Sequence, residues 1–439
     1  MDESEMELVE EKESESDEQD QEMDEEGSQE QNQDSKVYLP GQPLEEGEEL
    51  VCDQSAYIMY HQAQTSNPCL SFDIIPDNFG DDRETFPLTA YIVAGTQSSQ
   101  THNNHVIVMK LSNLHKTSPE EDENDSDEED EAKNPKMAGA LIKHQGCVNR
   151  IRNTTLNNKV LAASWSELGR INIWDLSVQL DVVEQDHQVL SKYNKEKSNS
   201  ISPIFTFNGH QKEGFAIDWC STAKGVLATG DCKRDIHIWK PSDAASWIVD
   251  QRPLVGHTDS VEDIQWSPNE RSVMASCSVD KSVRIWDVRA PPTKACMLTA
   301  ENAHESDVNV IHWNRNEPFI VSGGDDGFVH VWDLRRFQEK SPLASFKHHV
   351  EAVVSVEWHP KDSAVFASAG ADNQIALWDL SVEKDSEGSS EEVDGIPPQL
   401  LFIHQGQTNI KELHWHPQIP GVIISTAESG FNIFRTISV

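Results

Sequence analysis

One pattern constrains the fold of this chain more than any other: an aliphatic residue followed by tryptophan recurs at a near-constant step. The pairs end at Trp174, Trp239, Trp286, Trp332 and Trp378. The last three steps are 47, 46 and 46 residues, and a longer first step of 65 residues contains an insertion of mixed charge near residues 180–201. A period of 20–50 residues is typical of an array in which one supersecondary unit repeats.

A second marker, a histidine, precedes each of these tryptophans by 28–30 residues, and His404 stands 30 residues before Phe434 in a degenerate last repeat. In four repeats another tryptophan follows the histidine by nine residues. Between the markers, short segments such as VEDIQW, VMASCS and VRIWDV alternate with turn residues, which predicts strands. Four strands in roughly 45 residues are typical of one blade of a β-propeller.

The repeat count predicts an all-β chain with seven blades. Six repeats begin with a histidine, and residues 86–112 supply a further blade. The last repeat runs out of residues after FNIFR, so we expect a strand at residues 70–76 to close the ring. Closure of this kind leaves no exposed sheet edge.

The repeats resemble WD repeats, a family in which each blade holds a hydrogen-bonded tetrad of His, Ser or Thr, Asp and Trp. A buried Asp needs donors, which His N–H and Ser O–H supply, and the Trp indole N–H can donate to the hydroxyl. The resemblance assigns three complete tetrads: His257, Ser276, Asp280 and Trp286; His304, Ser322, Asp326 and Trp332; His349, Ser368, Asp372 and Trp378. Three repeats depart from the pattern, with Leu168 or Lys233 at the Asp position and Phe434 at the Trp position, and we expect these blades to be less rigid.

No constellation in the sequence supports catalysis. The His, Ser and Asp sets recur at blade spacing, whereas a nucleophilic triad occurs once per site. The HWH segment at 414–416 offers a candidate metal pair, but no third ligand follows at zinc-like spacing. Because phosphate-binding glycine loops are also missing from the sequence, we expect no enzyme activity, no cofactor and no metal site.

The net charge of −41 limits the partners. Binding led by DNA or RNA phosphates needs clustered Lys and Arg, and anionic membranes attract the same residues, so neither is an expected partner. Residues 1–34 carry a net charge of −16, and residues 120–131 hold ten acids and no base. Such a field favours basic proteins, although the acidic runs could instead serve only solubility.

Three further features place the chain among intracellular proteins. The N-terminus lacks the apolar region of a signal peptide, and no run of about 18 apolar residues predicts a membrane span. Seven Cys without a CxxC pair indicate reduced thiols.

Composition divides the chain into three parts. Residues 1–36 form an acidic tail that is expected to be disordered. Residues 37–79 are expected to contain an N-terminal helix, capped by Ser55 and ending near Ala63, followed by the closing strand. The propeller is expected to span residues 80–439, with acidic insertions at 116–137 and 383–398.

The segments at 38–79 and 386–417 resemble those of histone-binding WD proteins of chromatin-assembly and deacetylase complexes. In that family an amphipathic basic helix of a core histone lies between an N-terminal helix and an acidic D-G-P-P loop. The resemblance assigns the following client-binding residues: Tyr57, Met59, Tyr60, Glu391, Glu392, Asp394, Gly395, Pro397 and Pro398. Over nearly its full length the chain resembles the glutamate-rich WD-repeat family. This resemblance implies a nuclear and nucleolar histone-binding chaperone that also acts in ribosome biogenesis. Its clients would be core histones and a large-subunit ribosomal protein, with pre-ribosomal particles as possible partners. Alternatively, both segments are ordinary structural parts of the propeller.

A different function is indicated by two WDxR motifs on consecutive repeats, which end at Arg289 and Arg335. Paired WDxR motifs resemble those of substrate receptors of cullin-type ubiquitin ligases. In that alternative, the two arginines would contact the ligase adaptor.

Overall fold

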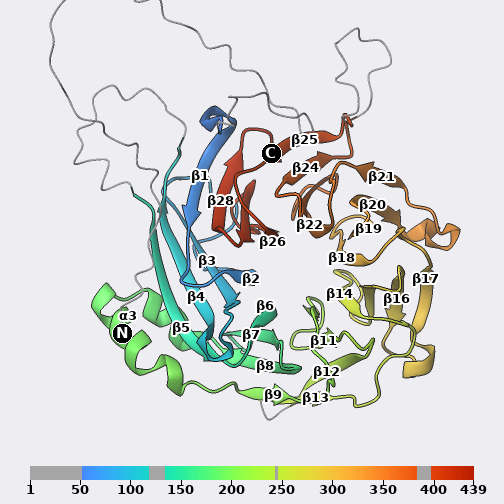
Figure 1. Ribbon diagram of the computed structural model, residues 1–439, viewed down its shortest axis with the longest axis horizontal. Helices are drawn as coiled ribbons and strands as arrows, with labels where there is room; N and C mark the ends of the chain where they lie inside the picture. Colours follow the sequence, from blue (N-terminus) through green and yellow to red (C-terminus); the bar gives the residue numbers. More distant parts are fainter. Residues whose placement is uncertain (1–51, 118–133, 243–245, 383–396) are drawn as a thin grey trace, which may run out of the picture.

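The computed structural model describes residues 52–117, 134–242, 246–382 and 397–439. They form seven four-stranded antiparallel sheets arranged in a ring (Figure 1), and this confirms the predicted seven-bladed propeller. The described residues contain no helix long and apolar enough to cross a membrane.

In blades one to six the strands follow one another outward, so the first strand lines the central channel and the fourth lies at the rim (Figure 1). In blade seven β26 lines the channel and β1 lies at the rim. Blade one consists of β2 (Cys69–Ile75), β3 (Leu88–Thr96), β4 (Asn104–Leu114) and β5 (Lys136–His144). Blade two consists of β6 (Val148–Leu156), β7 (Lys159–Ser166), β8 (Arg170–Asp175) and β9 (Phe205–Phe207). Blade three consists of β10 (Ala216–Trp219), β11 (Leu227–Gly230), β12 (Ile236–Ser242) and β13 (Ser246–Val249). Blades four and five consist of β14 (Val261–Trp266), β15 (Val273–Ser278), β16 (Val283–Asp287) and β17 (Cys296–Ala300); β18 (Val308–Trp313), β19 (Phe319–Gly324), β20 (Phe328–Asp333) and β21 (Ala344–Lys347). Blades six and seven consist of β22 (Val353–Trp358), β23 (Val365–Gly370), β24 (Ile375–Asp379) and β25 (Leu400–His404); β26 (Ile410–Trp415), β27 (Val422–Ala427), β28 (Gly430–Thr436) and β1 (Tyr57–Ala63).

The closing strand is not the predicted one. Strand β1 pairs antiparallel with β28 and completes the seventh blade, from Tyr57 opposite Thr436 to Ala63 opposite Phe431. Residues 70–76, expected to close the ring, fall largely within β2, the innermost strand of blade one. The helix expected at residues 55–63 was also wrong, because only a 3₁₀ turn (η1, Gln54–Ala56) precedes β1. Burial explains the strand, since alternate side chains of β1 enter the core between blades.

The three assigned tetrads lie within hydrogen-bonding distance. In blade four, Asp280 lies 2.9 Å from His257 Nδ1, and Ser276 Oγ lies 2.6 Å from His257 Nε2 and accepts from Trp286 Nε1 at 2.8 Å. The tetrads of His304 and His349 repeat this arrangement. Burial alone would raise the pKa of Asp280, but the hydrogen bond from His257 holds it well below its usual value.

Blade three contains a carboxylate that repeat spacing did not identify. Asp231, two residues before Lys233, lies 2.9 Å from His210 Nδ1 and also accepts from the backbone N–H of Lys233 at 3.0 Å. Thr229 Oγ1 lies 2.9 Å from His210 Nε2 and accepts from Trp239 at 3.0 Å. The assignment of Lys233 as a replacement for the carboxylate was therefore wrong. The turn is as long as in blade four, but its carboxylate stands two residues after Thr229, whereas Asp280 stands four residues after Ser276.

The other two irregular blades use substitutes. In blade two, His144 Nδ1 lies 2.9 Å from the carbonyl oxygen of Gly146, which takes the place of the tetrad carboxylate. In blade seven, Phe434 stacks on His404 with ring centroids 4.0 Å apart.

The tryptophan that ends the innermost strand connects neighbouring blades. Its indole N–H donates to a main-chain carbonyl oxygen on the innermost strand of the preceding blade, at 3.0–3.2 Å. Four tryptophans do this: Trp219, Trp266, Trp358 and Trp415. These contacts give a physical reason for the second tryptophan marker in the sequence.

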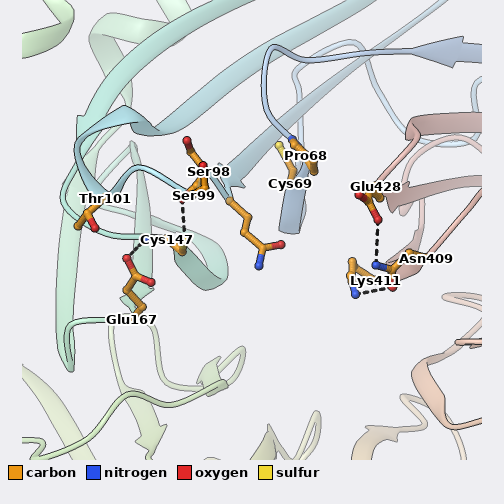
Figure 2. A pocket seen from close by; sticks show the side chains of 11 residues that line it. Pro68, Cys69, Ser98, Ser99, Thr101, Cys147, Glu167, Asn409, Lys411 and Glu428 are labelled. Carbon is orange, nitrogen blue, oxygen red and sulfur yellow. Dashed lines mark hydrogen bonds between the residues drawn. The ribbon is translucent and has the colours of Figure 1, made fainter.

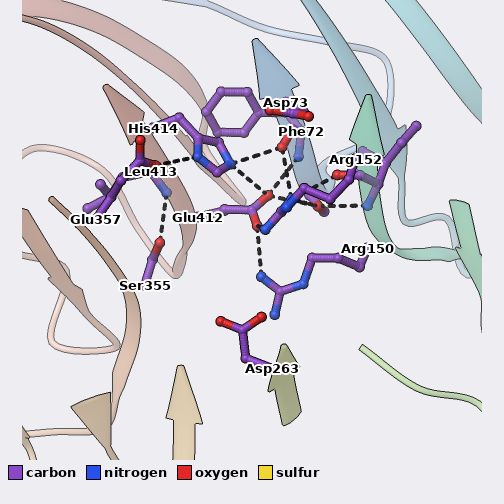
Figure 3. Close-up of polar contacts among 12 residues, drawn as sticks. Phe72, Asp73, Arg150, Arg152, Asp263, Ser355, Glu357, Glu412, Leu413 and His414 are labelled. Atoms are coloured by element: carbon purple, nitrogen blue, oxygen red, sulfur yellow. Dashed lines mark hydrogen bonds and ion pairs between the residues drawn. The ribbon is translucent and has the colours of Figure 1, made fainter. Parts of the chain in front are cut away.

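A buried carboxylate closes the ring at the channel (Figure 3). Glu412 of blade seven, 1% exposed, accepts from Ser71 Oγ at 2.7 Å and Phe72 N at 2.8 Å in blade one. It also pairs with Arg150 at 2.8 Å and Arg152 at 2.7 Å, both in blade two. One side chain therefore links the last blade to the first two.

The insertion near residues 180–201 folds into two helices that the sequence analysis did not predict: α2 (Ser177–Val183) and α3 (His187–Glu196). Asn194 of α3 accepts from Leu141 N at 3.0 Å and donates to Gly139 O at 2.9 Å. Both partners lie on β5, so the helices cover the outer edge of blade one.

Candidate client-binding edge

Strand β1 and strand β25, the outermost strands of blades seven and six, meet through Tyr57. The Tyr57 ring packs edge-on against Phe402 of β25, with centroids 5.4 Å apart. Asn432 Nδ2 donates to His404 Nε2 at 3.0 Å, which leaves His404 Nδ1–H to donate to the Tyr57 hydroxyl oxygen at 2.7 Å. Burial lowers the pKa of His404 to about 3, so the imidazole is neutral in this contact. We call Gln54–Tyr60 with Leu400–His404 and Ile437 the β1–β25 edge.

The structure divides the residues that were assigned to client binding. Met59 is fully buried and Tyr57 is 4% exposed, so neither can contact a client, and their assignment was wrong for this reason. Tyr60 is half-buried, with its hydroxyl accepting from Asn432 at 3.2 Å.

The acidic loop is described only at its end. Pro397 is half-buried and Pro398 is exposed, immediately before β25. Glu391, Glu392, Asp394 and Gly395 lie outside the described residues.

Three ends of the described chain that are near the acidic segments lie at or beside this edge. The described chain begins at residue 52, directly before η1 and β1. Thr117, which precedes residues 120–131, donates its N–H to Ile58 O at 3.1 Å and accepts from Tyr60 N at 2.9 Å. Pro397, which follows residues 383–394, leads into β25. Sequence reasoning missed the contact of Thr117, because no local signal pairs positions 58 and 117.

Ile437 adds an apolar contact point to this edge. Its side chain is 65% exposed, and its N–H donates to Ala56 O at 3.1 Å. The edge therefore combines exposed apolar surface with flanking acidic sequence, which suits an amphipathic basic segment.

A polar pocket of about 520 Å³ lies between blades seven, one and two (Figure 2). Glu428 and Lys411 border it on one side, and Glu167 borders it on the other. Glu167 accepts from Cys147 N at 2.9 Å, and Lys411 donates to Asn409 Oδ1 at 2.6 Å. These polar side chains bond to neighbouring protein groups at the rim of the pocket.

The WDxR arginines take matching conformations at the ends of β16 and β20. Arg289 donates through Nε to Asp287 at 2.9 Å, and Arg335 donates through Nε to Asp333 at 2.8 Å. Both side chains remain exposed, at 72% and 63%. Since they occupy equivalent positions in consecutive blades, they lie on the same face of the propeller.

Comparisons with known proteins agree with this architecture. The family model of the histone-binding protein RBBP4, which also describes a component of the CAF1 complex, matches residues 47–115, and these include β1 to β4. The model of the "WD domain, G-beta repeat" matches residues 249–287, 295–333 and 340–379.

Three curated relatives cover most of the chain. "Ribosome assembly protein rrb1" of Schizosaccharomyces pombe is 42% identical over 93% of this chain and 87% of its own length. "Glutamate-rich WD repeat-containing protein 1" of Dictyostelium discoideum is 42% identical over 91% and 85%. "Protein HEAT STRESS TOLERANT DWD 1" of Arabidopsis thaliana is 40% identical over 92% of each chain.

The fold and the repeat matches define the class: a seven-bladed WD-repeat scaffold. The chain belongs to the family of glutamate-rich WD-repeat-containing proteins.

Proposed function

We propose that this chain is a non-enzymatic acidic scaffold that chaperones basic client proteins. The clients are core histones and a large-subunit ribosomal protein, bound during chromatin assembly and ribosome biogenesis in the nucleus and nucleolus. The observation that carries the proposal is the position of the acidic segments, whose described neighbours meet at the β1–β25 edge. The histone-binding family model and the name of the rrb1 relative support the two kinds of client.

The mechanism has two parts. The acidic segments attract a basic protein over a long range and raise its association rate. The β1–β25 edge then provides apolar contacts to the client through the exposed Ile437 and the half-buried Phe402. A bound client is thereby kept from nonspecific contact with nucleic acid.

Charge reversal tests the first contact. Changing Glu391, Glu392 and Asp394 to Lys removes attraction beside β25 and should weaken the binding of core histones in a calorimetric titration, by about tenfold or more. The matched control reverses Asp181, Asp186 and Glu196 on the α2–α3 insertion, which leaves the same net charge. If both triple variants bind equally, only the total charge matters and docking at the edge is wrong.

An apolar substitution tests the second contact. Ile437→Asp places a charge in the exposed apolar surface and should accelerate client dissociation in a surface-based kinetic assay. Ile248→Asp, at another exposed isoleucine, 67% exposed and on β13, is the control. Equal dissociation rates for the two variants would argue against the edge.

The second candidate function is that of a ubiquitin-ligase substrate receptor, favoured by the matching exposure of Arg289 and Arg335. The double variant Arg289→Ala/Arg335→Ala should abolish capture of a cullin-ligase adaptor while leaving histone binding unchanged. Capture by the double variant at the wild-type level would exclude this use of the motifs.

A further inference from the structure

Blade five carries a second histidine beside its tetrad. His330 lies on β20, two residues before Trp332, and its ring centroid is 4.4 Å from that of His304. The equivalent residues in blades three, four and six are His237, Arg284 and Ala376, so the position accepts different side chains. This histidine therefore serves no general requirement of a blade.

Three potential ligand atoms meet here. One nitrogen of His304, one nitrogen of His330 and a carboxylate oxygen of Asp326 lie within 4.8 Å of one another. No other group of three His, Cys, Asp or Glu residues in the described part of the chain meets this criterion. The donor set of two imidazoles and one carboxylate matches the preferences of Zn²⁺.

The surrounding residues hold these ligands in place. His330 Nδ1 lies 2.9 Å from Ser345 Oγ, so Nδ1–H can donate to the hydroxyl and leave the Nε2 lone pair for an ion. The backbone N–H groups of Glu305 and Phe328 donate to Asp326 at 2.9 and 3.0 Å. Metal-binding histidines and carboxylates are commonly oriented by such outer hydrogen bonds.

A route to solvent adjoins the cluster. A cavity of about 400 Å³ is bordered by His304 and His330 and also by Lys281 and Pro342. An ion held by three protein ligands could therefore keep water, or an incoming imidazole or carboxylate, in its fourth position.

We propose that His304, Asp326 and His330 form a binding site for a divalent transition-metal ion, with Zn²⁺ as the best match. The ion coordinates His304 Nδ1, the atom whose proton bonds to Asp326 when no ion is bound. That proton is replaced by one on Nε2, which donates to Ser322 Oγ, 2.7 Å away. The imidazole stays neutral and no net proton is released. This site departs from the expectation, drawn from linear ligand spacing, that the chain binds no metal.

Titration of the full-length protein with Zn²⁺ tests the proposal, with Mg²⁺ in excess to occupy the acidic segments, which offer only oxygen ligands. The variant His330→Ala copies the residue found at this position in blade six, so it removes one ligand from a blade that tolerates alanine there. His237→Ala, the equivalent substitution in blade three, is the control. Melting temperatures without metal verify that both variants are folded.

We expect one Zn²⁺ per wild-type chain, affinity at least about tenfold weaker in His330→Ala, and wild-type affinity in His237→Ala. Zn²⁺ should also raise the melting temperature of the wild type more than that of His330→Ala. Equal affinity of the wild type and His330→Ala would show that the ion binds elsewhere, and would overturn the proposal.

Discussion

The substitution Glu412→Gln tests how the propeller closes. Glu412 bonds at once to Ser71, Phe72, Arg150 and Arg152, and so connects blade seven with blades one and two (Figure 3). Glutamine has nearly the same shape but no charge, and its amide N–H₂ cannot accept a hydrogen bond. The variant therefore leaves two largely buried guanidinium groups without their main counter-ion and keeps the packing intact.

The expected loss is large because the carboxylate is almost completely buried. Breaking a buried ion pair by removing one partner costs about 3–5 kcal/mol. Unfolding entropy of about 2.1 cal/mol/K per residue, over the roughly 350 described residues, gives about 0.7 kcal/mol/K. The free energy of unfolding should fall by about 3–5 kcal/mol, which corresponds to a decrease of about 4–7 °C in the melting temperature.

The measurement is thermal unfolding of the wild type and the variant, followed by circular dichroism at one scan rate. Glu339→Gln is the matched control, because Glu339 pairs with Arg336 at the surface, where side-chain exposures are 50% and 63%. Exposed pairs contribute at most about 1 kcal/mol, so the control should melt within about 1.5 °C of the wild type. If Glu412→Gln melts as high as Glu339→Gln, the buried carboxylate does not hold the ring closed and the reasoning fails.

Three other predictions follow from the structure. Asp231→Ala should destabilise the protein by about 1–3 kcal/mol in urea unfolding, whereas Lys233→Ala should not; the reverse order would contradict the tetrad of blade three. Burial disfavours the charged ring of His414, but Glu357 and Glu412 raise its pKa to about 10. Its contribution to stability is thus fully present below pH 6.5, its unfolded pKa, and is lost as the pH rises through about 10. The slope of this alkaline loss of stability reaches about 1.4 kcal/mol per pH unit, and His414→Gln should reduce it. Identical stability–pH profiles of the wild type and His414→Gln would contradict this role of His414. Deleting residues 1–34 should lower the association rate with histones and flatten its salt dependence in stopped-flow measurements; an unchanged salt slope would show that the tail does not steer clients.

The sequence was sufficient for the blade count because the repeat markers are local. A His and a Trp about 29 residues apart belong to one blade, and their hydrogen bonds to Ser or Thr recur in each regular repeat. Counting failed at Asp231, because the carboxylate stands earlier in a turn of unchanged length and a fixed register pointed to Lys233 instead.

Strand β1 was misread because seven residues carry too little periodicity. Tyr57, Met59 and Ala63 are buried on alternate positions, but Ile58 and Tyr60 are half-buried as well. Ser55 and Pro68 also matched the expected ends of a helix. Glu412 and Arg152 are 260 residues apart in sequence, so only the closed ring brings them together.

One rule of topology explains where this chain carries its insertions. In blades three to six the tetrad His precedes the first strand and the tetrad Asp follows the second, so the connection from the third to the fourth strand holds no tetrad residue. That connection can lengthen without breaking the network. It contains residues 118–133 in blade one, α2 and α3 in blade two, and residues 383–396 in blade six.

Antiparallel strands place all third-to-fourth connections on one face of the propeller. The N-terminal entry to β1 lies on this face too, because Tyr57 pairs with Thr436 at the end of the third strand of blade seven. The acidic segments adjoin three consecutive blades, six, seven and one, whereas Arg289 and Arg335 end third strands in blades four and five. Client capture and adaptor binding would therefore use neighbouring sectors of one face. The proposed metal site, formed by two tetrad residues of blade five and by His330 near the start of β20, belongs to the opposite face, so its loss should leave client affinity unchanged.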